Sequence, residues 1–99
     1  MPAFLIADDE VTDPAVFADY KRLVLPLIER FGGRFLSRGG ETVPLEGGRG
    51  WTPDKMVIIE FPDMAALQAW YACPEYEAVK EIRLRSARST LVALDSGMV

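Results

Sequence analysis

The stretch that decides the fold spans residues 55–71 and reads KMVIIEFPDMAALQAWY. Residues 55–61 are strongly apolar, which is typical of a buried strand. Pro62-Asp63 follows, and Asp is a preferred helix N-cap because its carboxylate accepts a hydrogen bond from an unpaired backbone N–H of the first turn. The apolar residues beyond it recur at helical spacing. The stretch therefore predicts a strand over 55–61 and a helix that begins after Asp63.

The N-terminal part of the chain repeats this pattern. Residues 3–7 are continuously apolar and predict a buried strand, which ends where a run of acids begins. Asp13-Pro14 then opens a helix, since proline lacks the N–H that would be unpaired at the first helical position. Gly32-Gly33 provides a left-handed exit from this helix.

The remaining segments complete the order of elements. Cys73-Pro74 interrupts the second helix, and a further helix continues to about Arg85. The other predicted segments are a strand at 34–38, a long glycine-rich loop at 39–53 with a short strand-like piece at 42–45, and a last strand at 87–94. The predicted order is therefore βαββαβ with a split second helix.

That order has few compact solutions. We expect residues 1–99 to form one α+β domain, with an antiparallel sheet in the spatial order 4-1-3-2 and the helices on one face. The other face is left bare, and its residues are too apolar to stay in water. We therefore expect a homodimer whose two sheets pack face to face into an α/β barrel. The residues assigned to this bare face are Met56, Ile58, Val92 and Leu94.

Composition narrows the possible partners. The chain has 49% hydrophobic and 26% charged residues, which is typical of a globular protein. A net charge of −4 argues against a nucleic-acid partner. No apolar run approaches the roughly 20 residues of a membrane span, and the first residues lack the basic start of a signal peptide. We therefore expect a cytoplasmic protein that binds neither nucleic acid nor membrane.

The absence of histidine excludes several chemistries. Ser-His-Asp and Cys-His nucleophiles, the usual zinc and copper sites and histidine-ligated haem all need this residue. The single cysteine, Cys73, is either a packing residue or a reactive thiol at a helix start. The acids at 8–10 and Asp13 fit no known cation loop, so they are interpreted as a solvated strand exit and a helix cap. We expect neither a metal nor a cofactor.

A series of short motifs resembles one known family along the whole chain. They are Val11-Thr12-Asp13-Pro14, Arg38-Gly39-Gly40, Leu45-Glu46-Gly47, Ile59-Glu60-Phe61-Pro62, Ala69-Trp70-Tyr71-x-x-Pro74-Glu75-Tyr76 and Arg83-x-Arg85. With them the chain resembles the bacterial family called domain of unknown function 1330, in the ferredoxin-like, dimeric α/β-barrel superfamily.

The resemblance implies a ferredoxin-like fold and a homodimer, but no reaction. A serine is usual at the position of Cys73, which weakens the thiol hypothesis. Relatives in the wider superfamily include cofactor-free monooxygenases, lactone isomerases and haem-dependent chlorite dismutases. The last of these depend on a histidine that this chain lacks.

Glu60 is the candidate catalytic residue. It ends a central strand and shares a face with Met56 and Ile58, where loss of water would raise the pKa of its carboxyl and suit it to general acid/base work. The register of the strand decides whether this face points toward the helices or away from them. The alternatives are an ion pair with an arginine or a solvated strand end. We expect the first and third strands to run in the same direction and the other two to oppose them. One end of the sheet then gathers Asp8, Glu60, Arg34 and Arg88, and the other end gathers Arg38 and Lys55.

The candidate ligand-binding residues are cations and aromatics. Four cations near the end of the last helix have two interpretations. Either they complement the negative end of the helix dipole, or they form an anion pocket in which Arg85 or Arg83 binds a carboxylate. The four are Lys80, Arg83, Arg85 and Arg88. Most aromatics lie on helical stripes and suit the core, whereas Trp51 lies in the loop and either covers a pocket or packs on the partner subunit. The assigned substrate-binding residues are Tyr20, Arg38, Trp51, Trp70, Tyr76 and Arg85.

These features predict a small-molecule pocket between sheet and helices. The expected ligand is a small acidic or aromatic molecule, and the expected chemistry is proton transfer without a cofactor, with Glu60 as base and Arg85 or Arg38 as anion anchor. The alternative is a non-catalytic ligand sensor or dimerisation module. It predicts that Glu60 is paired with an arginine and that there is no enclosed cavity.

Overall fold

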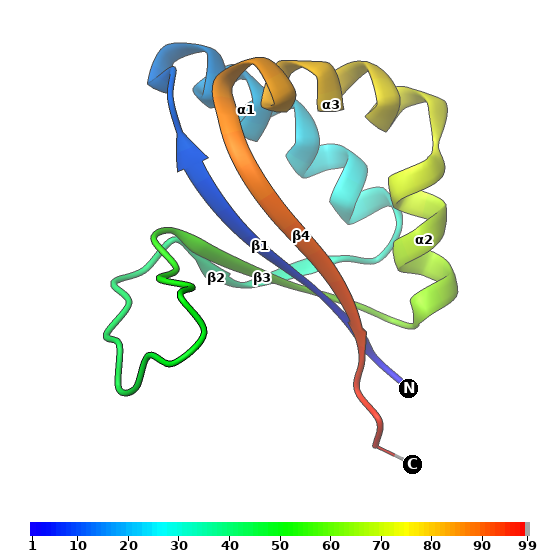
Figure 1. The fold of residues 1–99 in the computed structure, drawn as a ribbon. Helices are drawn as coiled ribbons and strands as arrows, with labels where there is room; N and C mark the ends of the chain where they lie inside the picture. Colours follow the sequence, from blue (N-terminus) through cyan, green and yellow to red (C-terminus); the bar gives the residue numbers. More distant parts are fainter. Residues whose placement is uncertain (99) are drawn as a thin grey trace.

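The computed structural model describes residues 1–98, in which three helices cover one face of a four-stranded sheet (Figure 1). The elements are β1 (Ala3–Val11), α1 (Pro14–Arg30), β2 (Arg34–Arg38), β3 (Met56–Phe61), α2 (Met64–Ala72), α3 (Pro74–Ser86) and β4 (Ala87–Asp95). The strand order is β2-β3-β1-β4, which is the predicted 4-1-3-2 order read from the other edge. All neighbouring strands are antiparallel. The predicted α+β fold is confirmed.

The expectation that the first and third strands run in the same direction is wrong. β1 pairs with β3 in the antiparallel sense, with Ala3 opposite Phe61 and Asp8 opposite Met56. The reason is the connection: a crossover through α1 makes β2 parallel to β1, and the loop after β2 returns the chain between them in the opposite direction. Glu60 therefore lies near the start of β1, far along the strand from Asp8.

This direction divides the charged group expected at one end of the sheet. Glu60 pairs in register with Arg34 of β2 near the start of β1. Asp8 and Arg88 lie at the other end, where Glu10 is opposite Arg88. Arg38 and Lys55 belong to that second end as well, since the backbone N–H of Asp9 donates to the carbonyl of Lys55.

Strand β1 is longer than predicted. It continues through the acids to Val11, because each of them stays in the ladder opposite a residue of β4. Ala3, Leu5, Ala7 and Asp9 are buried beneath the helices. The two-residue alternation of a strand thus carries Asp9, the second of the three consecutive acids, into the interior rather than into solvent.

The opposite side of the sheet bears no helix and is called the open face here. It carries an apolar surface, with Val92 and Leu94 each 51% exposed. The apolar residues of the open face are Phe4, Ile6, Met56, Ile58, Val92 and Leu94.

The long connection between β2 and β3 contains no strand, so the short strand predicted at 42–45 is wrong. The loop projects from the sheet at the end away from the termini (Figure 1). Thr42 uses its hydroxyl within the loop, donating to the carbonyl of Pro53 at 3.2 Å. Asp8 fastens the loop to β1, accepting from the Trp51 ring N–H at 3.0 Å and from the backbone N–H of Asp54 at 3.1 Å.

The predicted helix boundaries are confirmed. Asp13 and Asp63 cap α1 and α2, and their carboxylates accept from the backbone N–H groups three residues later at 3.3 and 2.8 Å. Gly32 ends the first helix with a φ of 83°, a conformation that glycine adopts without steric cost. Cys73 has an extended conformation between α2 and α3 and breaks the helix there.

Aromatic side chains join the helices to the sheet. Trp70, Tyr76 and Phe61 are fully buried. The Trp70 ring lies 4.3 Å from the Tyr76 ring and 5.7 Å from the Phe61 ring, centroid to centroid. None of the helices in residues 1–98 combines the length and apolar character that crossing a membrane would need.

Candidate functional site

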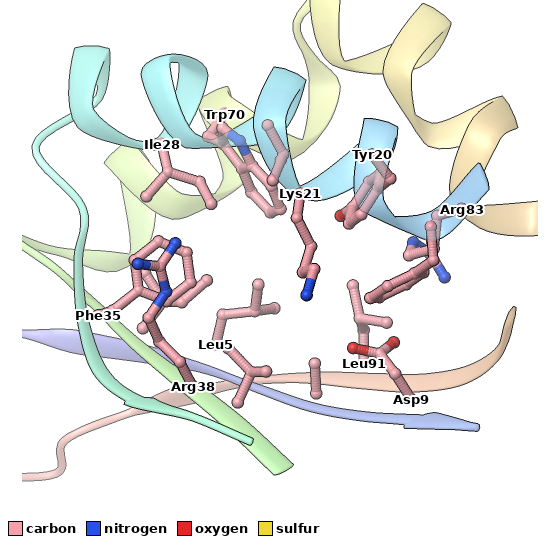
Figure 2. Close-up of a pocket in the computed structure, with 15 residues that line it drawn as sticks. Leu5, Asp9, Tyr20, Lys21, Ile28, Phe35, Arg38, Trp70, Arg83 and Leu91 are labelled. Carbon is pink, nitrogen blue, oxygen red and sulfur yellow. The ribbon is translucent and has the colours of Figure 1, made fainter. Parts of the chain in front are cut away.

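A cavity of about 90 Å³ lies between the helix-covered face of the sheet and the helices (Figure 2). A buried water needs roughly 10–15 Å³ by this measure, so the cavity has room for a small organic molecule. Its walls are mostly apolar, as in most ligand pockets. The sheet contributes Leu5, Ala7, Phe35, Val57, Ile59 and Leu91, and the helices contribute Phe17, Val24, Ile28 and Trp70.

Five polar side chains line this apolar space: Asp9, Tyr20, Lys21, Arg38 and Arg83. Asp9 and Arg83 are only 7% and 6% exposed, and we call them the inner end. Lys21 and Arg38 are exposed to solvent, and we call them the mouth. Figure 2 shows Arg38 on one side of the cavity, Asp9 and Arg83 on the other, and Lys21 between them.

Asp9 is held by the neighbouring strand. Ser89 lies directly opposite it in the β1–β4 register and donates from Oγ to Asp9 Oδ1 at 2.5 Å. Burial raises the pKa of Asp9, while the Ser89 hydrogen bond and the positive charge of Arg83 oppose this shift. The net direction is upward. A carboxyl with a raised pKa in a cavity is a candidate for proton exchange with a ligand.

Arg83 brings a buried positive charge to the inner end from the last turns of α3. Its Nε–H has no hydrogen-bond partner within residues 1–98. A buried donor without a partner costs about 1–3 kcal/mol, and more in a charged group. An oxygen atom of a ligand in the cavity would satisfy this donor.

Tyr20 and Tyr76 form the roof beside the inner end. Their hydroxyl oxygens are 3.0 Å apart and buried. Burial raises the pKa of Tyr20 far above its ordinary value, so its hydroxyl stays protonated at neutral pH. Tyr76 does not line the cavity itself but holds Tyr20 in place from behind.

Aromatic rings position the cations of the mouth. The Arg38 guanidinium lies 4.2 Å from the centroid of the Phe35 ring, and Lys21 Nζ lies 6.0 Å from that of Phe17. Such cation–π contacts contribute about 0.5–1 kcal/mol at exposed sites. They keep both charges beside the cavity while leaving their N–H groups free for a ligand.

Three of the sequence-predicted residues, Tyr20, Arg38 and Trp70, line the cavity together. Glu60 does not. It lies on the side of the sheet away from the helices, where Arg34 Nε donates to its Oε1 at 2.9 Å. The expectation that Glu60 lines the pocket is therefore wrong, because its neighbour Ile59 takes the buried side and a strand alternates.

Arg85 is also outside the cavity. It is exposed, whereas Arg83 is buried. Two residues along a helix correspond to about 200° of rotation, so the two arginines point to nearly opposite sides. Of the two arginines considered for an anion anchor, the helix turns Arg83 inward.

Trp51 lies in the loop on the open-face side of the molecule, and its side chain is 57% exposed. It borders a wide hollow of about 410 Å³ with Asp8, Arg88 and Thr90. It does not cover the cavity between sheet and helices. Of the two alternatives for Trp51, the structure of the single chain therefore does not support the one in which it covers this pocket.

Sequence reasoning missed Asp9 and Lys21. Asp9 continues the alternation of Ala3, Leu5 and Ala7, and this period of two was the available signal. Lys21 is four residues after Phe17, so one turn of α1 brings it to the same side of the helix.

The acids and the cysteine carry no further site. Alternation sends Asp8 and Asp9 to opposite faces of the sheet, and no group of three metal-ligating His, Cys, Asp or Glu side chains occurs in the described part of the chain. Cys73 is buried, with Arg30 Nη2 4.0 Å from its Sγ.

The fold and the cavity together define a ferredoxin-like α+β protein with a polar-ended pocket between sheet and helices. The motifs found in the sequence identify its family. The chain belongs to the family described as Domain of unknown function (DUF1330), whose model matches residues 2–96. No curated protein matches the chain.

Several solved structures share the fold. A protein of unknown function from Rhodopseudomonas palustris is 22% identical with a TM-score of 0.79, over 99% of this chain and 84% of that one. A dimeric ferredoxin-like protein of unknown function from Jannaschia sp. CCS1 is 15% identical with a TM-score of 0.68, over 96% and 99%. SnoaB, a cofactor-independent oxygenase from Streptomyces nogalater, is 15% identical with a TM-score of 0.64, over 99% and 95%. Identities this low show a common fold alone.

Replacing Asp9 with Asn should change how stability depends on pH. The folded pKa of Asp9 is raised above its ordinary value of 3.8, so the wild-type free energy of unfolding falls as pH rises from that value through the folded pKa. Asn has no charge to bury, so the stability of D9N relative to wild type should rise over the same window and then level off. A tenfold change in the acid dissociation constant corresponds to about 1.4 kcal/mol.

Urea unfolding at steps from about pH 3 to about pH 7 measures this difference. Ser89→Ala is the matched variant: it removes the hydrogen bond that favours the carboxylate, so it should extend the wild-type decline to higher pH. Parallel profiles for wild type and D9N would contradict the burial argument.

Proposed function

We propose that this chain works as a homodimer that binds a small acidic or aromatic molecule in the cavity between sheet and helices. We further propose that Asp9 accepts a proton from the bound molecule without help from a cofactor. One observation carries the proposal: the buried carboxyl of Asp9 lies with the buried guanidinium of Arg83 at the inner end of an otherwise apolar cavity.

The charges around the cavity favour an anionic ligand. Lys21, Arg38 and Arg83 are positive, and Asp9 is the single acid among the residues that line it. The excess of positive charge attracts an anion, and a guanidinium binds a carboxylate with two parallel hydrogen bonds. The apolar walls suit a hydrocarbon or aromatic body.

The geometry of Asp9 supports a proton-accepting role. Ser89 occupies Oδ1, which leaves Oδ2 for a ligand. In the proposed step, the carboxylate takes a proton from an O–H, or from a C–H beside a carbonyl, and becomes neutral while the ligand gains the negative charge. Arg83 stabilises that new charge. The proton returns to the ligand when the step reverses or the product forms, so no oxidant or metal is required.

The role first assigned to Glu60 thus moves to Asp9 in this proposal. Glu60 is paired with Arg34 across the open face, whereas Asp9 is inside the cavity. SnoaB is a cofactor-independent oxygenase with a similar fold, which supports the idea that this architecture hosts cofactor-free chemistry. That support is analogy at the level of the fold.

A non-catalytic ligand-binding module is the second candidate. It is favoured by the Glu60–Arg34 pair at 2.9 Å, which that hypothesis predicted. It also predicted that there is no enclosed cavity, and the cavity of about 90 Å³ is not enclosed, because its lining includes the exposed Lys21 and Arg38. In this alternative, the chain binds a ligand in the cavity without changing it.

The open face supports the homodimer. Its apolar side chains lie on adjacent strands, and Leu36 of β2 adds a further apolar side chain that is 49% exposed. Such a continuous apolar surface costs free energy in water, at roughly 25 cal/mol per Å². A second copy would cover it through a two-fold axis, since the same face occurs on both subunits.

The structural neighbour from Jannaschia is described as dimeric. In such a dimer, Trp51 is a candidate contact with the partner.

Binding in the cavity can be tested with a variant that fills it. Ala7 lies on β1 in the cavity wall, so Ala7→Phe should weaken the binding of small aromatic carboxylates by about tenfold or more. Calorimetric titration with a panel of these acids measures the affinity, and native mass spectrometry of fresh protein detects a co-purified molecule. Ala69→Phe, at an exposed position of α2, is the control. Equal affinity in wild type and A7F, or no binding by any acid in the panel, would refute binding in this cavity.

Proton transfer can be tested by isotope exchange. The wild type should accelerate exchange of the methyl C–H beside the ketone of 4-acetylbenzoate in D₂O, and Asp9→Asn should slow it by about 100-fold because the proton acceptor is lost. Proton NMR follows the exchange. Asp8→Asn, on the opposite face, should keep the wild-type rate. Tight binding of 4-acetylbenzoate with no acceleration would favour the non-catalytic alternative.

The homodimer can be tested by changing its proposed contact face. Val92→Lys places a charge on the open face and should convert a particle of about twice 11.0 kDa into one of 11.0 kDa. Light scattering after size exclusion measures the mass. Leu84→Lys changes a residue of α3 that is equally exposed, at 54%, and should remain dimeric. A folded wild type that is monomeric at micromolar concentration would end the dimer proposal.

A further inference from the structure

The two ends of the cavity differ in charge and burial. Both cations of the mouth are exposed: Arg38 lies at the side of the cavity away from Asp9 and Arg83, and Lys21 lies between the two sides (Figure 2). The inner end carries one buried cation and one buried acid, Arg83 and Asp9. Figure 2 shows the apolar side chains of the walls between them. A ligand that fills the cavity therefore meets different chemistry at each of its ends.

The mouth is built for a full negative charge. Within residues 1–98, neither Lys21 nor Arg38 forms an ion pair with an acid. Arg34, four residues before Arg38 on the same strand, shows the contrast because it is paired with Glu60. The cations of the mouth are held over aromatic rings instead, so their charge is available to a carboxylate.

The inner end is built for an uncharged oxygen. Asp9 and Arg83 line the same part of the cavity and their charges interact, so a second carboxylate there would face the negative charge of Asp9. Arg83 still has an Nε–H without a partner. A carbonyl or hydroxyl oxygen would accept from this N–H, and a hydroxyl would also donate to Asp9.

We propose that the cavity selects monocarboxylates with an apolar or aromatic body and an uncharged oxygen at the far end, with the carboxylate at Arg38 and the oxygen at Arg83 and Asp9. This inference rests on the proposed ligand-binding function and adds the orientation and class of the ligand. It predicts discrimination against a ligand that lacks either group, and against a dicarboxylate.

Four probes of similar shape test the two ends separately. Calorimetry should give the highest affinity for 4-hydroxybenzoate. Benzoate lacks the far oxygen, 4-hydroxybenzamide lacks the charge, and terephthalate carries a second carboxylate. Each should bind about ten to 100 times more weakly, which is the usual loss for a hydrogen bond to a charged group.

Variants assign each end to its residues. Arg38→Met should lower the affinity for 4-hydroxybenzoate about tenfold or more and leave the affinity for 4-hydroxybenzamide nearly unchanged. Arg83→Met should lower the affinity for 4-hydroxybenzoate and leave the affinity for benzoate nearly unchanged. If R83M fails to fold, Asp9→Asn is used in its place. It should raise the affinity for terephthalate relative to that for 4-hydroxybenzoate, because the negative charge that repels the second carboxylate is gone. Arg34→Met is the matched control and should not change any of the four affinities.

The outcomes separate this inference from the function on which it rests. If 4-hydroxybenzoate and 4-hydroxybenzamide bind equally, and R38M weakens both alike, the orientation is refuted while binding in the cavity stands. If none of the four probes binds but other acids bind wild type and not A7F, the proposed ligand class is refuted and the cavity keeps its function. If no acid binds at all, both fail.

Discussion

Strand β1 is the constraint on which the rest of the structure depends. It is hydrogen-bonded along both edges, to β3 and to β4, so its residues cannot slip without breaking two ladders. This fixed register sends Leu5, Ala7 and Asp9 under the helices. The helices cover this side of the sheet and leave a cavity that all three residues line, with Asp9 at its inner end. The site follows from the position of one carboxyl in a strand that has no freedom to turn it outward.

Local features of the chain were predictable because they depend on neighbours in sequence. The Asp caps, the glycine exit after α1 and the break at Cys73 involve residues within a few positions of each other. The sheet order also followed from the order of elements. The direction of β3 relative to β1 was misjudged, and that error placed Glu60 beside Asp8 when the ladder separates them.

The candidate site was predictable only in part. Tyr20 and Trp70 were found because they lie on the apolar stripes of helices that must face the sheet. Asp9 was not, because three consecutive acids resemble the solvated end of a strand, and the residue that holds Asp9 is 80 positions away. Glu60 and Ile59 show the same limit. A shift of one residue moves a side chain to the other face of the sheet, and the register is fixed only by pairing with the neighbouring strand.

The adjacent acids Asp8 and Asp9 have a consequence for the layout of the molecule. Asp8 fastens the loop that contains Trp51, and Asp9 forms the end of the cavity, so a single peptide unit joins the two. That unit is rigid and planar, and both residues are held in the ladders of the sheet. The anchor of the loop and the polar end of the cavity are therefore separated by no more than the thickness of one strand.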